Sequence, residues 1–146
     1  TINRGAVEEI CKRLNPGLIV FDQIDKLKGF DGDREDLRLG SIYQWSRELA
    51  KLWCPVIGVS QANGAAEGTK WLTMDHVAGS YTSKQAEADF ILGIGKTHDP
   101  NLEQVRHFNI CKNKLQGDED SVPEMRHARI DVLILPEVAQ YREIVE

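Results

Sequence analysis

Three of the short apolar runs in the sequence are followed by side chains that could handle a phosphate group. These side chains are Asp22 after one run, Gln61 after another, and Lys112 and Lys114 after a third. Ligands of open parallel sheets bind beyond the carboxyl ends of the strands. A carboxylate there can orient a magnesium ion, an amide can sense a phosphate oxygen, and cations can offset charge that develops in phosphoryl transfer. The set therefore favours a magnesium-bound phosphate, although each residue alone is common at ordinary strand ends and surfaces.

Other kinds of chemistry find little support in the sequence. The stretch Gly93–Thr97 imitates the end of a phosphate-binding loop, but the pattern GxxxxGK[ST] requires glycine where Phe90 stands. The histidines lack zinc-site spacing, the three cysteines form no CxxC pair, and no GxSxG is present. The sequence therefore contains no complete nucleotide-binding P-loop, and it favours neither a zinc site nor a nucleophilic enzyme.

Periodic and apolar segments predict the elements that position these residues. Apolar residues at helical spacing predict helices at 2–14, 37–53 and 79–88. Apolar runs predict strands at 18–22, 56–59, 90–95, 107–111, 130–135 and 141–145. The first strands are apolar on both faces, which is typical of buried parallel strands. The pattern predicts an α/β fold with a mostly parallel sheet flanked by helices and an antiparallel edge at the C-terminus.

Composition limits the class of protein. The chain has 146 residues, 41% of them apolar and 28% charged, as in one ordinary globular domain or part of one. A net charge of −5 gives no overall basic footprint for nucleic acid, but it leaves a local basic surface possible. We find no apolar run long enough to cross a membrane, no signal peptide and no disulfide pattern. These observations predict a cytoplasmic protein without a membrane partner.

The order of the motifs resembles the C-terminal half of a RecA-type ATPase core, most closely that of DnaB-like replicative helicases, including phage primase-helicases. The segment LIVFD at 18–22 resembles the Walker B strand, and VIGVSQ at 56–61, with the Ala-Asn that follows, resembles the strand ending in Ser-Gln-Leu-Asn. Residues 79–96 resemble the family's helix, Ala-Asp pair, apolar strand and basic residue. Residues 110–117 resemble its Lys-x-Arg-x-x-Gly segment. The resemblance covers about residues 1–135.

The resemblance implies a role for each matching position. Asp22 would hold Mg²⁺ through water, and Gln61 would sense the γ-phosphate of ATP. Lys112 and Lys114 would reach the ATP bound by a neighbouring subunit. The loops 25–36 and 62–76 would face a central channel that holds single-stranded DNA. Their candidate phosphate contacts are Lys26, Lys28 and Lys70.

The chain also departs from the family pattern. Lys114 occupies the position of the arginine finger, and lysine cannot make the planar two-pronged contact of arginine. Arg126 or Arg129 could supply that cation instead. The family's P-loop and catalytic glutamate lie upstream of the Walker B strand and have no match in this chain. We therefore expect residues 1–146 to be the C-terminal portion of a RecA-like helicase ATPase domain with the P-loop half absent, and to be inactive alone.

The resemblance implies an ATP-dependent DNA helicase of replication, with ATP and Mg²⁺ as cofactors and a homo-oligomeric, hexameric ring as the assembly. Three alternatives stay open on the sequence alone. The chain could belong to a RecA/RadA- or KaiC-like ATPase, or serve as a non-catalytic RecA-like docking module. It could also be an unrelated α/β domain in which Asp22 and Gln61 are ordinary loop residues.

Overall fold

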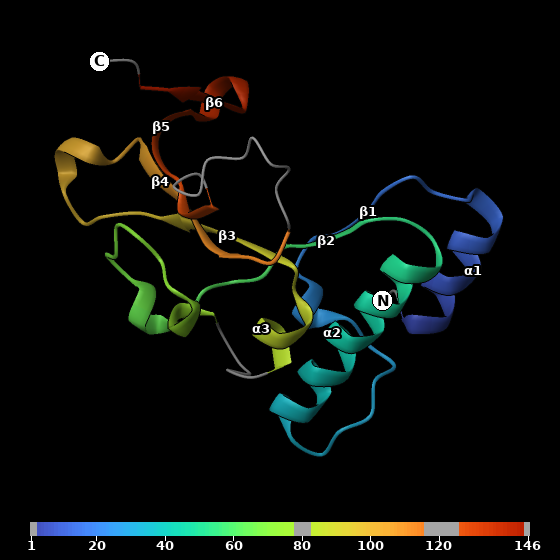
Figure 1. Cartoon of the computed structure of the whole chain (residues 1–146). Helices are drawn as coiled ribbons and strands as arrows, with labels where there is room; N and C mark the ends of the chain where they lie inside the picture. The colour runs from blue at the N-terminus through green and yellow to red at the C-terminus, as the bar shows by residue number, and fades with distance from the viewer. Residues whose placement is uncertain (1–2, 78–82, 116–125, 145–146) are drawn as a thin grey trace. The chain divides into compact units, whose positions relative to one another are not determined.

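The computed structural model describes residues 3–77, 83–115 and 126–144 (Figure 1). The chain divides into two compact units. Unit 1 comprises residues 1–62 and 77–88, and unit 2 comprises residues 63–76 and 89–146. No helix within the described ranges combines the length and the apolar character that crossing a membrane requires.

The described residues of unit 1 form three α-helices and a small parallel sheet. Its elements in chain order are α1 (Arg4–Leu14), β1 (Ile19–Phe21), α2 (Glu35–Leu52), β2 (Val56–Gly58) and α3 (Ser83–Glu87). β1 pairs in parallel with β2, so that Ile19 faces Val56 and Phe21 faces Gly58. The helices predicted at 2–14 and 37–53 and the first two predicted strands are confirmed, with small shifts in their ends. The start of the helix predicted at 79–88 lies outside the described residues.

Local sequence explains where α1 begins and ends. The side chain of Asn3 accepts a hydrogen bond from the Ala6 amide, which satisfies one of the unpaired donors at the helix N-terminus. At the other end Asn15 adopts a left-handed conformation with φ of 45°, as asparagine often does after a last helical turn. Pro16 then prevents the helix from continuing.

The core of unit 1 lies between its helices and one face of β1 and β2. Val7 and Cys11 of α1 and Trp45 and Leu49 of α2 are buried together, and the partly buried side chains packed against them include Ile19, Phe21 and Val56. The alternate strand residues point away from this core, and Val20 and Ile57 are 57% and 51% exposed. The expectation that these strands are buried on both faces is therefore wrong for the second face.

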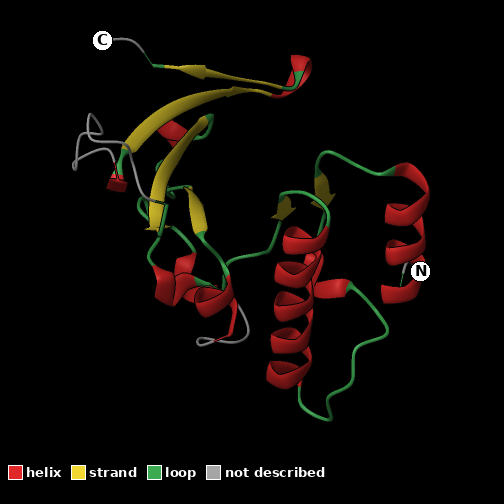
Figure 2. Cartoon of the chain, turned by 45° about the vertical axis from the view of Figure 1, so that its right-hand side comes forward, coloured by secondary structure: helices red, strands yellow, loops and turns green. Residues whose placement is uncertain are grey.

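Unit 2 is an antiparallel sheet. Its strands are β3 (Phe90–Gly95), β4 (Val105–Asn113), β5 (Arg129–Leu135) and β6 (Gln140–Glu143), in the spatial order β3-β4-β5-β6. Figure 2 shows them as yellow arrows. The predicted antiparallel edge is confirmed, but the mostly parallel sheet is not. Residues 96–104 join β3 to β4, and this link is shorter than the dozen or so residues that a parallel crossover needs.

Within unit 2, residues 63–76, which form most of the loop after β2, pack against the antiparallel sheet. The side chain of Asn109 accepts a hydrogen bond from the Leu72 amide at 3.0 Å and donates one to the Leu72 carbonyl at 2.7 Å. Glycine allows this close approach, because a Cβ added to Gly93 would lie 2.9 Å from the Leu72 Cβ. The Asn109 side chain thus satisfies both the amide and the carbonyl of Leu72, as the backbone of a neighbouring strand would.

Candidate functional site

The ends of β1 and β2 bring the first two predicted site residues onto adjacent loops. Asp22 follows β1 directly, and its side chain is exposed. The chain then turns through Gln23, whose φ of 56° is unusual for a residue with a side chain. Gln61 comes soon after β2 and is exposed as well. The structure therefore places Asp22 and Gln61 after neighbouring parallel strands, as the sequence predicts, while their roles stay predictions.

Two backbone hydrogen bonds continue the pairing beyond the strands. The Val59 amide donates to the Phe21 carbonyl at 2.9 Å, and the Ile24 amide donates to the Val59 carbonyl at 3.1 Å. Ile24 also packs over Gly58, where an added Cβ would lie 2.9 Å from the Ile24 Cδ1. The two loops are thus tied together at their start.

A polar cluster that the sequence analysis missed lies at these loops. The Lys84 ammonium donates to the Asp25 carboxylate at 2.7 Å and to the Ser60 hydroxyl at 3.1 Å. Ser60 donates in turn to the same Asp25 oxygen at 2.6 Å, and the Tyr43 hydroxyl donates to the other at 2.9 Å. The Lys84 side chain is only 2% exposed. We call these four residues the Lys84 cluster.

The electrostatics of the Lys84 cluster suit a fixed arrangement rather than proton transfer. Burial, strengthened by the negative charge of Asp25, raises the pKa of Tyr43 far above its ordinary value, so its hydroxyl keeps its proton and donates. The Lys84 ammonium also lies over the Tyr43 ring, 5.2 Å from its centre. An ammonium that donates to a carboxylate has no lone pair to act as a base. The cluster therefore holds chain segments together.

Little in the sequence could have revealed this cluster. Asp25 sits in a charged segment and Ser60 precedes Gln61, so both lie close to residues predicted for the site. Lys84 occurs in a short polar helix, and lysine is rarely buried unless it is paired. Its partners are 59 and 24 residues away along the chain, so local spacing carries no sign of them.

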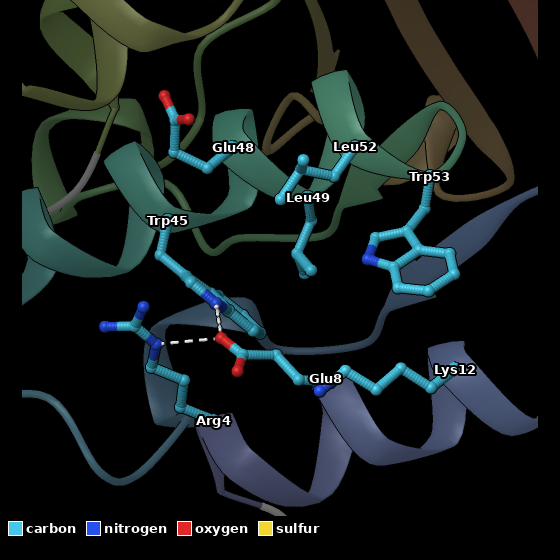
Figure 3. Close-up of a pocket in the computed structure, with 8 residues that line it drawn as sticks. All are labelled: Arg4, Glu8, Lys12, Trp45, Glu48, Leu49, Leu52 and Trp53. Atoms are coloured by element: carbon cyan, nitrogen blue, oxygen red, sulfur yellow. Dashed lines mark hydrogen bonds and ion pairs between the residues drawn. The ribbon is translucent and has the colours of Figure 1, made fainter.

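Unit 1 also has a groove of about 300 Å³ between α1 and α2 (Figure 3). Four aromatic or apolar and four charged side chains line it: Trp45, Leu49, Leu52, Trp53, Arg4, Glu8, Lys12 and Glu48. Glu8 accepts hydrogen bonds from the Trp45 indole at 2.8 Å and from Arg4 at 2.9 Å. None of these residues belongs to the site predicted from the sequence.

Comparison with known proteins establishes the fold. No protein-family model and no curated protein matches the sequence. Among solved structures, the ATPase domain of G40P matches 96% of this chain with a TM-score of 0.73 and 16% sequence identity. A DnaB-like replicative helicase, described with its interactions with primase, matches with the same coverage, score and identity. The chain shares the fold of part of these DnaB-like ATPase domains.

The match covers only part of each relative. The chain spans 50% of the G40P chain and 34% of the DnaB-like helicase chain. The likeness to DnaB-like, RecA-type ATPase domains is confirmed, but the mostly parallel core is not, and what the complete protein does is a matter for proposal.

Lys112 lies in β4 of unit 2, and Lys114 follows the last residue of that strand. Lys112 is half-buried and pairs in register with Ile91 of β3. Lys114 is exposed, and its backbone amide donates to the Asp89 carbonyl at 2.8 Å. Neither lysine belongs to the Lys84 cluster, which lies in unit 1. The alternative cations are exposed, with Arg126 bonded to the Leu115 carbonyl at 3.0 Å.

The lysines predicted to contact DNA differ in their surroundings. Lys26 and Lys28 are exposed in unit 1. Lys70 instead forms an ion pair with Asp131 at 3.1 Å and lies over the Trp71 ring, 4.8 Å from its centre. Asp131 is also bonded to the buried His107 at 2.7 Å. Lys70 thus already has an anionic partner, which weakens its case as a phosphate contact.

The residues present fit a magnesium ion of the kind that the resemblance implies. Mg²⁺ is usually held by one or two carboxylates together with water and substrate phosphates. Asp22 supplies one exposed carboxylate beside a strand end, which matches that need. Within the described ranges, no group of three or more acidic, histidine or cysteine side chains forms a cage for a metal.

Proposed function

We propose that this chain is the C-terminal part of the ATPase domain of a DnaB-like helicase motor, which couples ATP hydrolysis at subunit interfaces to translocation on single-stranded DNA during replication. One observation carries the proposal. In a chain with the fold of such ATPase domains, Asp22 and Gln61 follow two parallel strands that pair directly. An acid and an amide at adjacent strand ends suit a magnesium-bound triphosphate.

Each residue has a defined task in this proposal. Asp22 holds Mg²⁺ through water, and the ion offsets the charge of the phosphates when it is bound. Gln61 senses the γ-phosphate through its amide and passes the state of the nucleotide to the loop that follows it. Lys112 and Lys114 offset charge on ATP bound to a neighbouring subunit of a hexameric ring. Lys26 and Lys28 contact the DNA backbone.

The phosphate-binding loop has to come from another part of the motor, because this sequence contains no complete GxxxxGK[ST] motif. Backbone amides of that loop supply most of the contacts to the phosphates. We therefore expect residues 1–146 alone to show no measurable ATP hydrolysis. Turnover by this chain that Asp22→Asn abolishes would contradict an incomplete site.

The full-length protein provides the decisive experiment. Gln61→Ala should leave nucleotide binding intact but remove the stimulation of ATP hydrolysis by single-stranded DNA. Asp22→Asn should abolish hydrolysis at every DNA concentration. Gln44→Ala, an exposed glutamine on α2, is the matched control and should behave like the wild type. Unchanged DNA stimulation in Gln61→Ala would refute the sensor role, and failure to unwind a forked duplex would favour a RecA- or KaiC-like ATPase.

A further inference from the structure

α3 reaches the ends of both parallel strands through one side chain. Lys84 extends from this five-residue helix to Asp25 in the loop after β1 and to Ser60 in the loop after β2. Arg47 of α2 holds the same helix, donating to the Glu87 carbonyl at 2.7 Å. The Lys84 ammonium therefore sits where three segments of unit 1 meet.

The partners of Lys84 stand next to the two residues of the proposed site. Asp25 lies in the turn that begins at Asp22, and Ser60 directly precedes Gln61. Arg38 of α2 steadies the same turn by donating to the Asp25 carbonyl at 3.1 Å and to the Leu27 carbonyl at 3.3 Å. A shift of Asp25 or Ser60 therefore moves the backbone that carries Asp22 or Gln61.

We propose that Lys84 is a positioning residue for Asp22 and Gln61, acting through Asp25 and Ser60. This inference rests on the proposed function of those two residues. The Lys84 ammonium keeps the carboxylate and the hydroxyl together, and this fixes the distance between the acid that meets the metal and the amide that meets the γ-phosphate. Misplacing a catalytic group by about 1 Å can cost about 100-fold in rate, so a buried clamp at this point has a large effect.

A purely structural ion pair would look similar in the folded chain but would behave differently when removed. It would lower stability without changing the site at temperatures where the protein stays folded. A positioning residue changes the environment of Asp22 and Gln61 even in the folded protein. The experiment therefore needs a readout at those residues as well as a melting curve.

The first measurement uses residues 1–146 and requires no activity. Lys84→Met should shift or broaden the backbone amide resonances of Asp22 and Gln61 in NMR spectra recorded well below the melting temperature. Lys51→Met, which removes an exposed lysine of α2, is the matched control and should leave both resonances in place. Unchanged resonances in Lys84→Met would overturn the positioning role.

The second measurement uses ATP hydrolysis by the full-length protein. Lys84→Met should lower kcat by about 10- to 100-fold while KM for ATP changes little. Asp25→Asn should act similarly, and the double variant should be no worse than either, because both changes break one interaction. A normal kcat in Lys84→Met alongside inactive Asp22→Asn would reject the positioning role and keep the proposed function. Normal hydrolysis in Asp22→Asn would reject the proposed function. The NMR resonances of Asp22 and Gln61 in Lys84→Met would then still show whether Lys84 positions these two residues.

A milder variant guards against loss of folding. Ser60→Ala keeps the ion pair between Lys84 and Asp25 but removes the hydroxyl that both contact. We expect it to shift the Asp22 resonance and to lower kcat, both less than Lys84→Met does. A Ser60→Ala protein with an unmoved Asp22 resonance and a normal kcat would also count against the proposal.

Discussion

Lys84 and Asp25 form an ion pair of 2.7 Å in which the ammonium is 2% exposed and the carboxylate 25% exposed. The pair joins residues 59 positions apart and carries two further hydroxyl groups, from Tyr43 and Ser60. Removing a charge from water is costly, so such a pair persists only when its hydrogen bonds are well satisfied. The Lys84 cluster meets this condition, because Asp25 accepts bonds from three donors.

Lys84→Met should destabilise unit 1 strongly. The change leaves the Asp25 carboxylate partly buried without its cation, and breaking such pairs costs about 3 kcal/mol. The free energy of unfolding, measured by urea denaturation of residues 1–146, reports the loss. Lys51→Met removes an exposed lysine and should cost less than about 0.5 kcal/mol. Equal losses of unfolding free energy in the two variants would show that the buried ion pair stabilises unit 1 no more than the exposed lysine does.

Gly95→Ala should disrupt the contact between the loop after β2 and the sheet of unit 2. An added Cβ would fall on the carbonyl oxygens of Thr69 and Lys70, the former 2.5 Å away. The loop must then move off the strand, at a cost of about 2 kcal/mol, which is typical of overpacked sites. Chemical denaturation of residues 1–146 measures this loss of unfolding free energy. Gly64→Ala is the matched control, because nothing lies within 4 Å of its added Cβ. A Gly95→Ala protein as stable as the control would contradict this contact.

Trp45→Phe should affect Glu8 as well as stability. The indole of Trp45 donates to the Glu8 carboxylate at 2.8 Å. Hydrogen bonds from Arg4 first, and from Trp45 second, lower the pKa of Glu8 below its ordinary 4.5. Without the indole the pKa should rise toward that value, and unfolding should become easier by about 1 kcal/mol. An NMR titration of Glu8 checks the first effect. Trp53→Phe is the control and should leave the pKa of Glu8 unchanged.

The ends of β1 and β2 could be predicted because a short apolar run and the polar residue after it can both be recognised in the local sequence. β1 and β2 coincide with the apolar runs before Asp22 and Gln61, and their parallel pairing places those two residues on adjacent loops. The direction of β3 relative to β4 was harder to predict from apolar character alone. A mostly parallel sheet was predicted, although the link at residues 96–104 is too short for a parallel crossover.

The Lys84 cluster and the position of Lys70 could not be predicted from local patterns. Lysine is usually solvated, so a pattern of residue types assigns both to the surface. Lys84 is buried because Asp25 and Ser60 reach it from two distant loops, and Lys70 is paired because the loop after β2 lies on the sheet near Asp131. Each outcome depends on tertiary packing that one segment does not encode.

Acid should weaken unit 2 through Asp131. Burial alone would raise the pKa of this carboxyl, but hydrogen bonds from His107 and Lys70 outweigh burial and lower the pKa below its ordinary 3.8. A pKa that is lower in the folded state stabilises the fold above the ordinary value, and the gain disappears as pH falls through the folded value. The contribution should therefore be complete above about pH 5 and shrink steadily below about pH 4.

Asp131→Asn isolates this contribution. At pH 7 the change should lower the free energy of unfolding by only about 1 kcal/mol, because the carboxylate is 35% exposed and water screens the interaction. Denaturation curves from about pH 2 to pH 7 should show the variant and the wild type converging in acid. Asp33→Asn, an exposed carboxylate before α2, should differ from the wild type by less than about 0.5 kcal/mol throughout. A gap for Asp131→Asn that stays constant down to the most acidic pH would show that the charge of Asp131 does not hold the loop to the sheet.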